Sequence, residues 1–427
     1  MPRPNLSPTT LARSSRHIWR LTCLASLLGA ITTPAFADSC PPEKLQVVAR
    51  YFSSATPEAP ENYRNAYKHY PSRLVHASGQ LSPLAQGVPL GNVEFSYDGK
   101  SQRLDEFLAA TRTSAFLVLQ DGKVRNEQYF NGNGPDTPLL LNSMTKSVVS
   151  LLVGIALDQK LIASVDDPII RYLPELKGSA YETATVRQVL DMTTAIAYPG
   201  QDPKASGRGR DIQAAAGKSF ACGESLRPHP AGAQPAGDGK HGERWLYANT
   251  NTQVLGALLE RVSGMSVSTF MERNLWSRIG AEGDAYWLLD QSDDKTAIEQ
   301  TWMGLNARLR DVGRIGQMVL QDGQWQGQQI VSKAWLEESA QPTAPFLQQL
   351  EARPAFGYSH QWFVPVGKDH ELMGLGFGGQ MLYINPAKRL VVVQLTTDPN
   401  FDSKKTAEEA LVVFRSIAGS LGQGDAP

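Results

Sequence analysis

The clearest hydrophobic pattern in this chain is a predicted β-hairpin followed by a long apolar run. Residues 114–120 are mostly apolar, the turn signal Asp121-Gly122 follows, and residues 123–130 would form the second strand of the hairpin. An almost continuous apolar run over 148–157 follows. Its length and composition predict a buried helix at about 143–159.

The middle of the chain has helical periodicity, and the C-terminal part returns to strands. Amphipathic patterns predict helices over 185–192, 251–263, 307–320 and 333–339. Apolar patterns predict strands over 358–364, 380–384 and 390–397, and a last helix over 406–417. These elements favour an α/β (α+β) fold. An antiparallel sheet of about five strands would combine the hairpin with the last three strands, flanked by helices, with a mainly helical lobe inserted at about 165–340.

The N-terminus has the features of an export signal. Arg13, Arg16 and Arg20 precede an apolar stretch over 21–31, and the small-residue sequence Ala35-Phe36-Ala37 follows. The apolar stretch is too short to span a membrane. We therefore expect 1–37 to be a signal peptide and the mature protein to be periplasmic or secreted and not membrane-bound, with a retained N-terminal anchor as the alternative.

The segments outside the main pattern carry weaker signals. Residues 38–100 are rich in Pro, Ser and Tyr, which predicts an extended N-terminal segment ahead of a main domain at 101–427. Cys40 and Cys222 remain after signal removal, and an oxidising compartment permits a disulfide between them. Residues 199–243 are dense in Gly, Pro and Ala, which fits either a lid over a substrate site or a surface insert.

Composition and charge exclude several classes of function. The chain has 427 residues, 41% of them hydrophobic, which suffices for a large core. A formal net charge of −1 gives no indication of a nucleic-acid partner. The seven histidines include no pair at metal-ligand spacing, and neither a P-loop nor a dinucleotide-binding fingerprint is present. We expect no metal and no cofactor.

A candidate nucleophile lies at the start of the predicted helix. Ser143 and Lys146 are three residues apart, so a helix places them on the same face. A hydroxyl beside an amine, at the positive end of a helix dipole, can become a nucleophile. Ser292 and Lys295 have the same spacing but lie in a charged stretch with no apolar run behind them, which predicts a surface loop. A helix N-cap serine beside a solvated lysine is the structural alternative for Ser143.

Two further elements can complete an acyl-transfer site. Tyr247 precedes a predicted helix, and a nearby ammonium would favour its phenolate form, which could accept the serine proton. The glycine-dense stretch 374–380 includes Gly376 and Gly378, whose backbone could approach a ligand closely and supply an N–H to an oxyanion hole. A core tyrosine and a plain glycine turn are the structural alternatives.

In this order, the three elements resemble the serine β-lactamase and penicillin-recognising superfamily, class C β-lactamase-like branch. The Ser-x-x-Lys motif of the superfamily falls on Ser143 and Lys146, and its Tyr-x-Asn motif on Tyr247 and Asn249. The Lys-Thr-Gly or His-x-Gly motif does not appear at its expected place, which argues against an efficient β-lactamase. The glycine-rich stretch that stands in place of this motif is more similar to 6-aminohexanoate-dimer hydrolase-like serine hydrolases. That similarity makes Asn251 a second candidate, beside Asn249, for contact with substrate.

The resemblance implies an exported serine hydrolase that acts on a small amide or ester through a Ser143 acyl-enzyme, with Lys146 and Tyr247 together as general base. Which of the two holds the proton stays open, because they titrate as a coupled unit. Three alternatives stand beside this reading. They are a penicillin- or peptidoglycan-binding protein that is acylated without turnover, a class C-type β-lactamase or D,D-peptidase, and a structural protein with a relict site.

Overall fold

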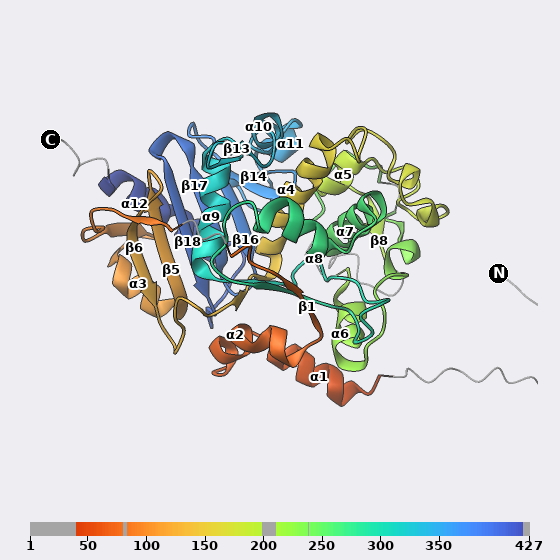
Figure 1. Cartoon of the computed structure of the whole chain (residues 1–427), viewed down its shortest axis with the longest axis horizontal. Helices are drawn as coiled ribbons and strands as arrows, with labels where there is room; N and C mark the ends of the chain where they lie inside the picture. The colour runs from red at the N-terminus through yellow and green to blue at the C-terminus, as the bar shows by residue number, and fades with distance from the viewer. Residues whose placement is uncertain (1–39, 80–82, 199–210, 238, 422–427) are drawn as a thin grey trace, which may run out of the picture. The chain divides into compact units, whose positions relative to one another are not determined.

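The computed structural model describes residues 40–79, 83–198, 211–237 and 239–421. Within these residues, eight strands form the main sheet (Figure 1). Their order is β14 (Phe356–Ser359), β15 (Trp362–Pro365), β16 (Leu372–Gly376), β17 (Gln380–Asn385), β18 (Leu390–Thr396), β5 (Thr113–Gln120), β6 (Lys123–Tyr129) and β2 (Ala85–Gln86). Neighbouring strands are antiparallel except β2, which pairs in parallel with β6.

Both faces of the sheet are covered, which explains why β5 is apolar at almost every position. Leu117 and Leu119 belong to the core that includes α9 (Leu309–Leu320) and α4 (Thr145–Asp158). Phe116 and Val118 belong to the core on the other face, with α3 (Leu104–Ala110) and α12 (Lys405–Leu421). Successive strand side chains point to opposite faces, so a strand covered on both faces shows no polar alternation.

Small residues bring α9 close to the sheet. A Cβ atom added to Gly313 would lie 2.5 Å from Leu117 Cδ2, and one added to Gly316 would lie 2.6 Å from Val391 Cγ1. Larger side chains at these positions would push the helix away from the strands. α9 therefore packs on the main sheet, although it lies within the range 165–340 predicted for the helical lobe.

The class of fold predicted from the sequence is confirmed, with more strands than expected. The hairpin of β5 and β6 joins β17 and β18 in one sheet as predicted, and β16 is a further strand between β15 and β17. The prediction of a single strand over 358–364 is wrong, because these residues form the hairpin of β14 and β15. His360 and Gln361 form its two-residue turn, with φ of 44° and 66°. Neither residue is typical of such a turn, so the sequence pattern does not show where the turn lies.

A smaller sheet of four short strands supports the middle of the chain. Its order is β1 (Ser72–Val75), β10 (Ala285–Leu288), β11 (Leu305–Ala307) and β7 (Leu139–Leu140). The predicted helices in this region correspond to α5 (Val186–Leu190), α7 (Asn249–Ser263), α9 and α10 (Lys333–Ser339). α7 packs against α4 and α5, so it faces the helix that begins beside Ser143.

The prediction of an extended segment at 38–100 is wrong for its first part. This part contains α1 (Pro42–Tyr51) and α2 (Ala59–His69). Aromatic contacts among Tyr51, Phe52, Tyr70 and Phe220 hold it in place, rather than an aliphatic stripe with helical period. That packing has no simple periodic signature in the sequence.

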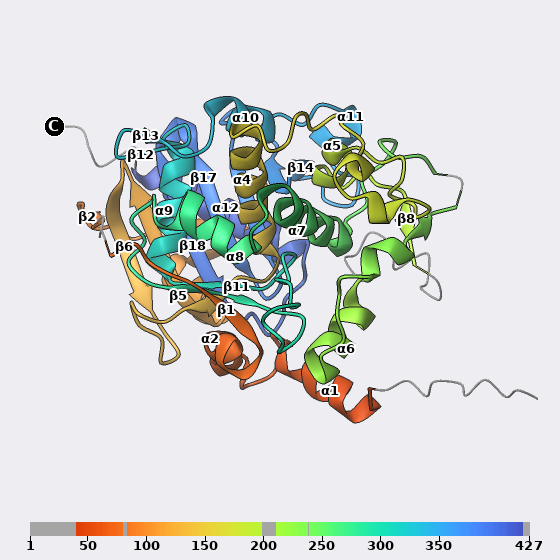
Figure 2. The same ribbon diagram turned by 45° about the vertical axis from the view of Figure 1, so that its right-hand side comes forward.

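The predicted pairing of Cys40 with Cys222 is confirmed, with Cα atoms 5.8 Å apart. The bond attaches the start of α1 to the end of α6 (Gln213–Cys222), and the two helices lie side by side (Figure 2). Residues 1–37, the predicted signal peptide, lie outside the described residues. In the part of the chain that the structure describes, no helix is both long enough and apolar enough to cross a bilayer.

Candidate active site

Ser143 lies on a tight turn that leads into α4. β7 ends at Leu140, and the 3₁₀ turn η1 (Asn142–Met144) follows directly. Asn142 has a φ of 47°, and its Nδ2 donates a hydrogen bond to the carbonyl of Phe377 at 2.9 Å. The turn is thereby attached to the glycine-rich end of β16. Ser143 is partly exposed, whereas the residues that flank it are buried.

Lys146 lies one turn along the same helical face, as predicted from the spacing. Its Nζ donates to Ser143 Oγ at 3.0 Å and to the carbonyl oxygen of Trp302 at 2.7 Å. The side chain is 1% exposed. Burial lowers the pKa of Lys146 to about 7, against the opposing effect of the carboxylate of Asp211, which raises it. A large fraction of the molecules therefore carry a neutral amine at this position near neutral pH.

Tyr247 completes the group from the loop that precedes α7. Its phenol is hydrogen-bonded to Ser143, and its ring centre is 5.2 Å from Lys146 Nζ. Burial raises the pKa of Tyr247 to about 12, although the Ser143 hydrogen bond and the charge of Arg353 lower it. Burial therefore opposes the expected phenolate form of Tyr247. Lys146 is the stronger candidate for the proton acceptor.

The two asparagines that competed for a substrate-contacting role differ in the structure. Asn251 is fully buried, and its Oδ1 accepts hydrogen bonds from Tyr181 Oη at 2.8 Å and Thr194 Oγ1 at 2.9 Å. Its Nδ2 donates to the sulfur of Met192 at 3.5 Å. Asn251 therefore holds α7 to its neighbours, and these contacts give no support to the predicted contact with substrate. Asn249 begins α7, two residues after Tyr247, and is 5% exposed.

The two candidate oxyanion-hole glycines also differ. Gly376 lies against the nucleophile turn, since an added Cβ would be 2.5 Å from the Leu141 carbonyl oxygen and 3.1 Å from the Met144 nitrogen. Only a glycine permits this approach of β16 to η1. Gly378 has a φ of 77°, and an added Cβ would contact Tyr63 Oη of α2 at 3.3 Å. Its position supports the turn after β16 and gives no support to a role at the oxyanion.

Three residues near the nucleophile were missed by sequence reasoning. Asp211 accepts hydrogen bonds from the backbone nitrogens of Asn249 at 2.9 Å and Thr250 at 2.7 Å, so it fixes the start of α7 beside Tyr247. Trp302 contributes a carbonyl, which no side-chain motif can reveal. Arg353 lies 5.3 Å from the ring centre of Phe363, which stacks on Tyr247. Each belongs to a loop without a readable pattern.

The competing Ser-x-x-Lys match is a surface segment, as predicted. Ser292 and Lys295 are both exposed, and the segment is held by turns around Asp293. Among the described residues, no cluster of three His, Cys, Asp or Glu side chains could bind a metal ion. The described polar groups that meet at Ser143 are therefore a hydroxyl, an amine and a phenol.

A serine, a buried amine and a phenol therefore lie together at the base of α4. Comparison with known proteins gives the family of the chain. The chain belongs to the Beta-lactamase family, whose model matches residues 101–414. It is 30% identical over 359 residues to a 6-aminohexanoate-dimer hydrolase of Paenarthrobacter ureafaciens, an alignment that covers 81% of this chain and 88% of the relative. The chain is therefore a hydrolase of this family.

Solved structures share the fold at lower sequence identity. A Bacillus anthracis protein, described as a candidate 6-aminohexanoate-dimer hydrolase, has a TM-score of 0.76 at 23% identity. The match covers 88% of this chain and 98% of the other. The hydrolase EstCE1, described as having promiscuous acyltransferase activity, has a TM-score of 0.59 at 16% identity, over 74% and 96% of the two chains. These structures confirm the arrangement of sheet and helices.

Proposed function

We propose that the protein is an exported serine hydrolase that cleaves a small amide or ester through an acyl-enzyme on Ser143. The observation that carries this proposal is the hydrogen bond of 3.0 Å between Lys146 Nζ and Ser143 Oγ, at a lysine whose pKa is lowered to about 7 by burial. A buried neutral amine in contact with a hydroxyl can accept its proton at neutral pH.

In the first step, the lone pair of the Lys146 amine takes the proton of Ser143 Oγ while Oγ attacks the carbonyl carbon of the substrate. The carbonyl oxygen becomes an oxyanion, for which the backbone N–H groups of Ser143 and of the β16 end near Gly376 are the proposed donors. The tetrahedral intermediate collapses with cleavage of the bond to the amine or alcohol. Tyr247, hydrogen-bonded to Ser143, passes a proton to that leaving group and is reprotonated from Lys146.

In the second step, water takes the place of the leaving group. The neutral amine of Lys146 accepts a proton from water, and the resulting hydroxide attacks the acyl carbon. The bond to Ser143 Oγ breaks, and the proton returns to the serine. The product is a carboxylic acid, and the enzyme is restored. Deacylation therefore uses the same amine as acylation, which the distance of 3.0 Å between Lys146 Nζ and Ser143 Oγ permits.

The name of the Paenarthrobacter relative suggests a linear amide as one substrate class. A screen that compares the linear 6-aminohexanoate dimer, p-nitrophenyl butyrate and nitrocefin tests the proposal. We expect turnover of the amide or the ester, little or none of nitrocefin, and complete loss in Ser143→Ala. The matched control Ser292→Ala alters the exposed Ser-x-x-Lys segment and should keep full activity. A burst of acylation without steady turnover of any substrate would favour the binding protein, and unchanged activity of Ser143→Ala would refute the proposal.

A further inference from the structure

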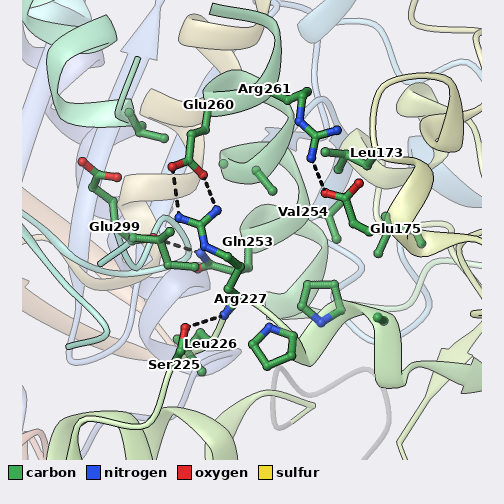
Figure 3. A pocket seen from close by; sticks show the side chains of 18 of the residues that line it. Leu173, Glu175, Ser225, Leu226, Arg227, Gln253, Val254, Glu260, Arg261 and Glu299 are labelled. Carbon is green, nitrogen blue, oxygen red and sulfur yellow. Dashed lines mark hydrogen bonds and ion pairs between the residues drawn. The ribbon is translucent and has the colours of Figure 1, made fainter. Parts of the chain in front are cut away.

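A cavity of about 950 Å³ lies along α7 and is lined by α7 residues from Gln253 to Arg261 (Figure 3). Its walls come from α7, from the segment 225–231 and from residues 298–299. Ser143, Lys146 and Tyr247 are not among its lining residues. The volume is in the range of pockets that enclose a small molecule.

The inner lining of this cavity is largely apolar. Leu173, Leu226, Val254, Val267 and Ile298 contribute side chains to it, and each is nearly fully buried by the rest of the protein. Two prolines of the segment 225–231 add further apolar surface. Apolar walls favour a ligand with a predominantly apolar body, because such a ligand displaces water from surface that water solvates poorly.

The charges around the cavity neutralise one another. Arg227 makes two hydrogen bonds to the Glu260 carboxylate, at 2.9 Å and 3.1 Å, and Arg261 donates to Glu175 at 2.7 Å (Figure 3). The remaining lining carboxylate, Glu299, pairs with an arginine outside the cavity at 2.7 Å. A charged ligand would have to separate one of these pairs, so the lining favours a neutral one.

The cavity is linked to the catalytic amine through two short routes. Leu226 and Ile298 line it and belong to a small buried cluster against which Trp302 packs. The carbonyl oxygen of Trp302 accepts the hydrogen bond from Lys146. The second route starts at Gln253 in the lining, whose Oε1 accepts from the backbone nitrogen of Thr301 at 3.2 Å, one residue before Trp302.

We propose that this cavity binds a neutral, predominantly apolar small molecule, and that its occupancy alters the rate at which Ser143 is acylated by shifting the segment that ends at Trp302. Binding is independent of the proposed function, whereas the effect on rate rests on it. Two sources could supply such a ligand. One is a second molecule of a neutral ester substrate, and the other is an unrelated apolar metabolite.

Two dyes with the same ring system test the binding part. N-phenyl-1-naphthylamine is neutral, and 8-anilinonaphthalene-1-sulfonate adds a sulfonate. We expect the Ser143→Ala protein to bind the neutral dye saturably at one site and the anionic dye more weakly. Ala257→Trp on α7 and Ala231→Trp in the adjoining loop each fill the cavity and should weaken the neutral dye by about tenfold or more, which is about 1.4 kcal/mol. Ala109→Trp, at an exposed position of α3, should change nothing.

The binding proposal is overturned if both cavity variants, with wild-type circular dichroism spectra, bind the neutral dye as tightly as the Ala109→Trp control. It is also overturned if the sulfonate binds equally well, or if fluorophosphonate labelling of wild-type Ser143 abolishes dye binding, which would place the dye in the catalytic site. For coupling, saturating neutral dye should change the labelling rate of wild type about fivefold or more, and not that of Ala257→Trp. An unchanged rate in wild type would overturn the coupling while leaving the hydrolase proposal intact.

Discussion

Replacing Lys146 with methionine tests whether the buried amine lowers the stability of the folded protein, apart from its role as proton acceptor. Burial lowers the pKa of Lys146 from 10.5 to about 7. Each unit of that difference corresponds to about 1.4 kcal/mol, so the folded protein disfavours the protonated form by about 4–5 kcal/mol. Methionine removes this cost and also loses the hydrogen bonds to Ser143 and Trp302, worth about 1 kcal/mol each. We predict that Lys146→Met is about 2–3 kcal/mol more stable than wild type at pH 7.

The pH dependence of this gain has a definite sign. Below pH 7, Lys146 is protonated in both the folded and the unfolded protein, so the full cost is present in wild type. Between pH 7 and 10.5, the unfolded protein keeps the proton that the folded protein has released, and the stability of wild type rises with pH. The advantage of Lys146→Met is therefore full below pH 7 and fades as the pH approaches 10.5.

Urea unfolding at about pH 6.5 and 9.5 measures the difference. Lys146→Arg is the matched control, because its permanent charge should make it less stable than wild type at pH 9.5, where Lys146 is neutral in the folded protein. Both variants should be labelled by a fluorophosphonate about 10²–10⁴ times more slowly than wild type. A Lys146→Met protein that is less stable than wild type at pH 6.5, or whose difference does not vary with pH, would refute the reasoning from burial.

Three further predictions follow from the same contacts. Tyr247→Phe removes the phenol bound to Ser143, and acylation by p-nitrophenyl butyrate, followed in a stopped-flow burst, should slow by about 10²-fold or more; an unchanged burst rate would exclude Tyr247 from proton transfer. The double variant Cys40→Ser/Cys222→Ser opens a link across 182 residues and should lower the free energy of unfolding by about 2–5 kcal/mol; equal denaturation midpoints would contradict this. Gly154→Ala places a Cβ 2.4 Å from the Trp335 ring and should lower the free energy of unfolding by about 1–3 kcal/mol. The control Gly419→Ala, whose added Cβ has no atom within 4 Å, should leave the free energy of unfolding unchanged or raise it. Equal effects of the two substitutions would show that the α4–α10 contact is not tight.

The sequence predicts those parts of the fold that local pattern determines. The hairpin of β5 and β6, the last strands and the helix α10 show clear periodicity, and the structure has them at or near the predicted residues. The turn at His360 and Gln361 was not predictable, because neither residue is a usual signal for positive φ. The helices α1 and α2 were missed because aromatic contacts and a disulfide hold them, rather than an aliphatic face.

Only those residues of the candidate site that belong to a sequence motif are predictable. Ser143 and Lys146 are close because a helix brings residues three apart onto one face, which the spacing alone implies. The proton positions were not predictable, since the pKa of Tyr247 depends on its burial in the folded protein. The acceptor at Trp302 is a backbone carbonyl, and Asp211 acts from a loop, so neither leaves a pattern in the sequence.

The most direct test of the account is to locate the covalent adduct. The protein is treated with a fluorophosphonate at pH 8, where the amine of Lys146 is mostly neutral, and the labelled peptide is identified by tandem mass spectrometry. The account predicts one equivalent of label per chain, attached to Ser143, with no label on Ser292 and none on the Ser143→Ala protein. Label on another residue, or undiminished labelling of Ser143→Ala, would contradict it.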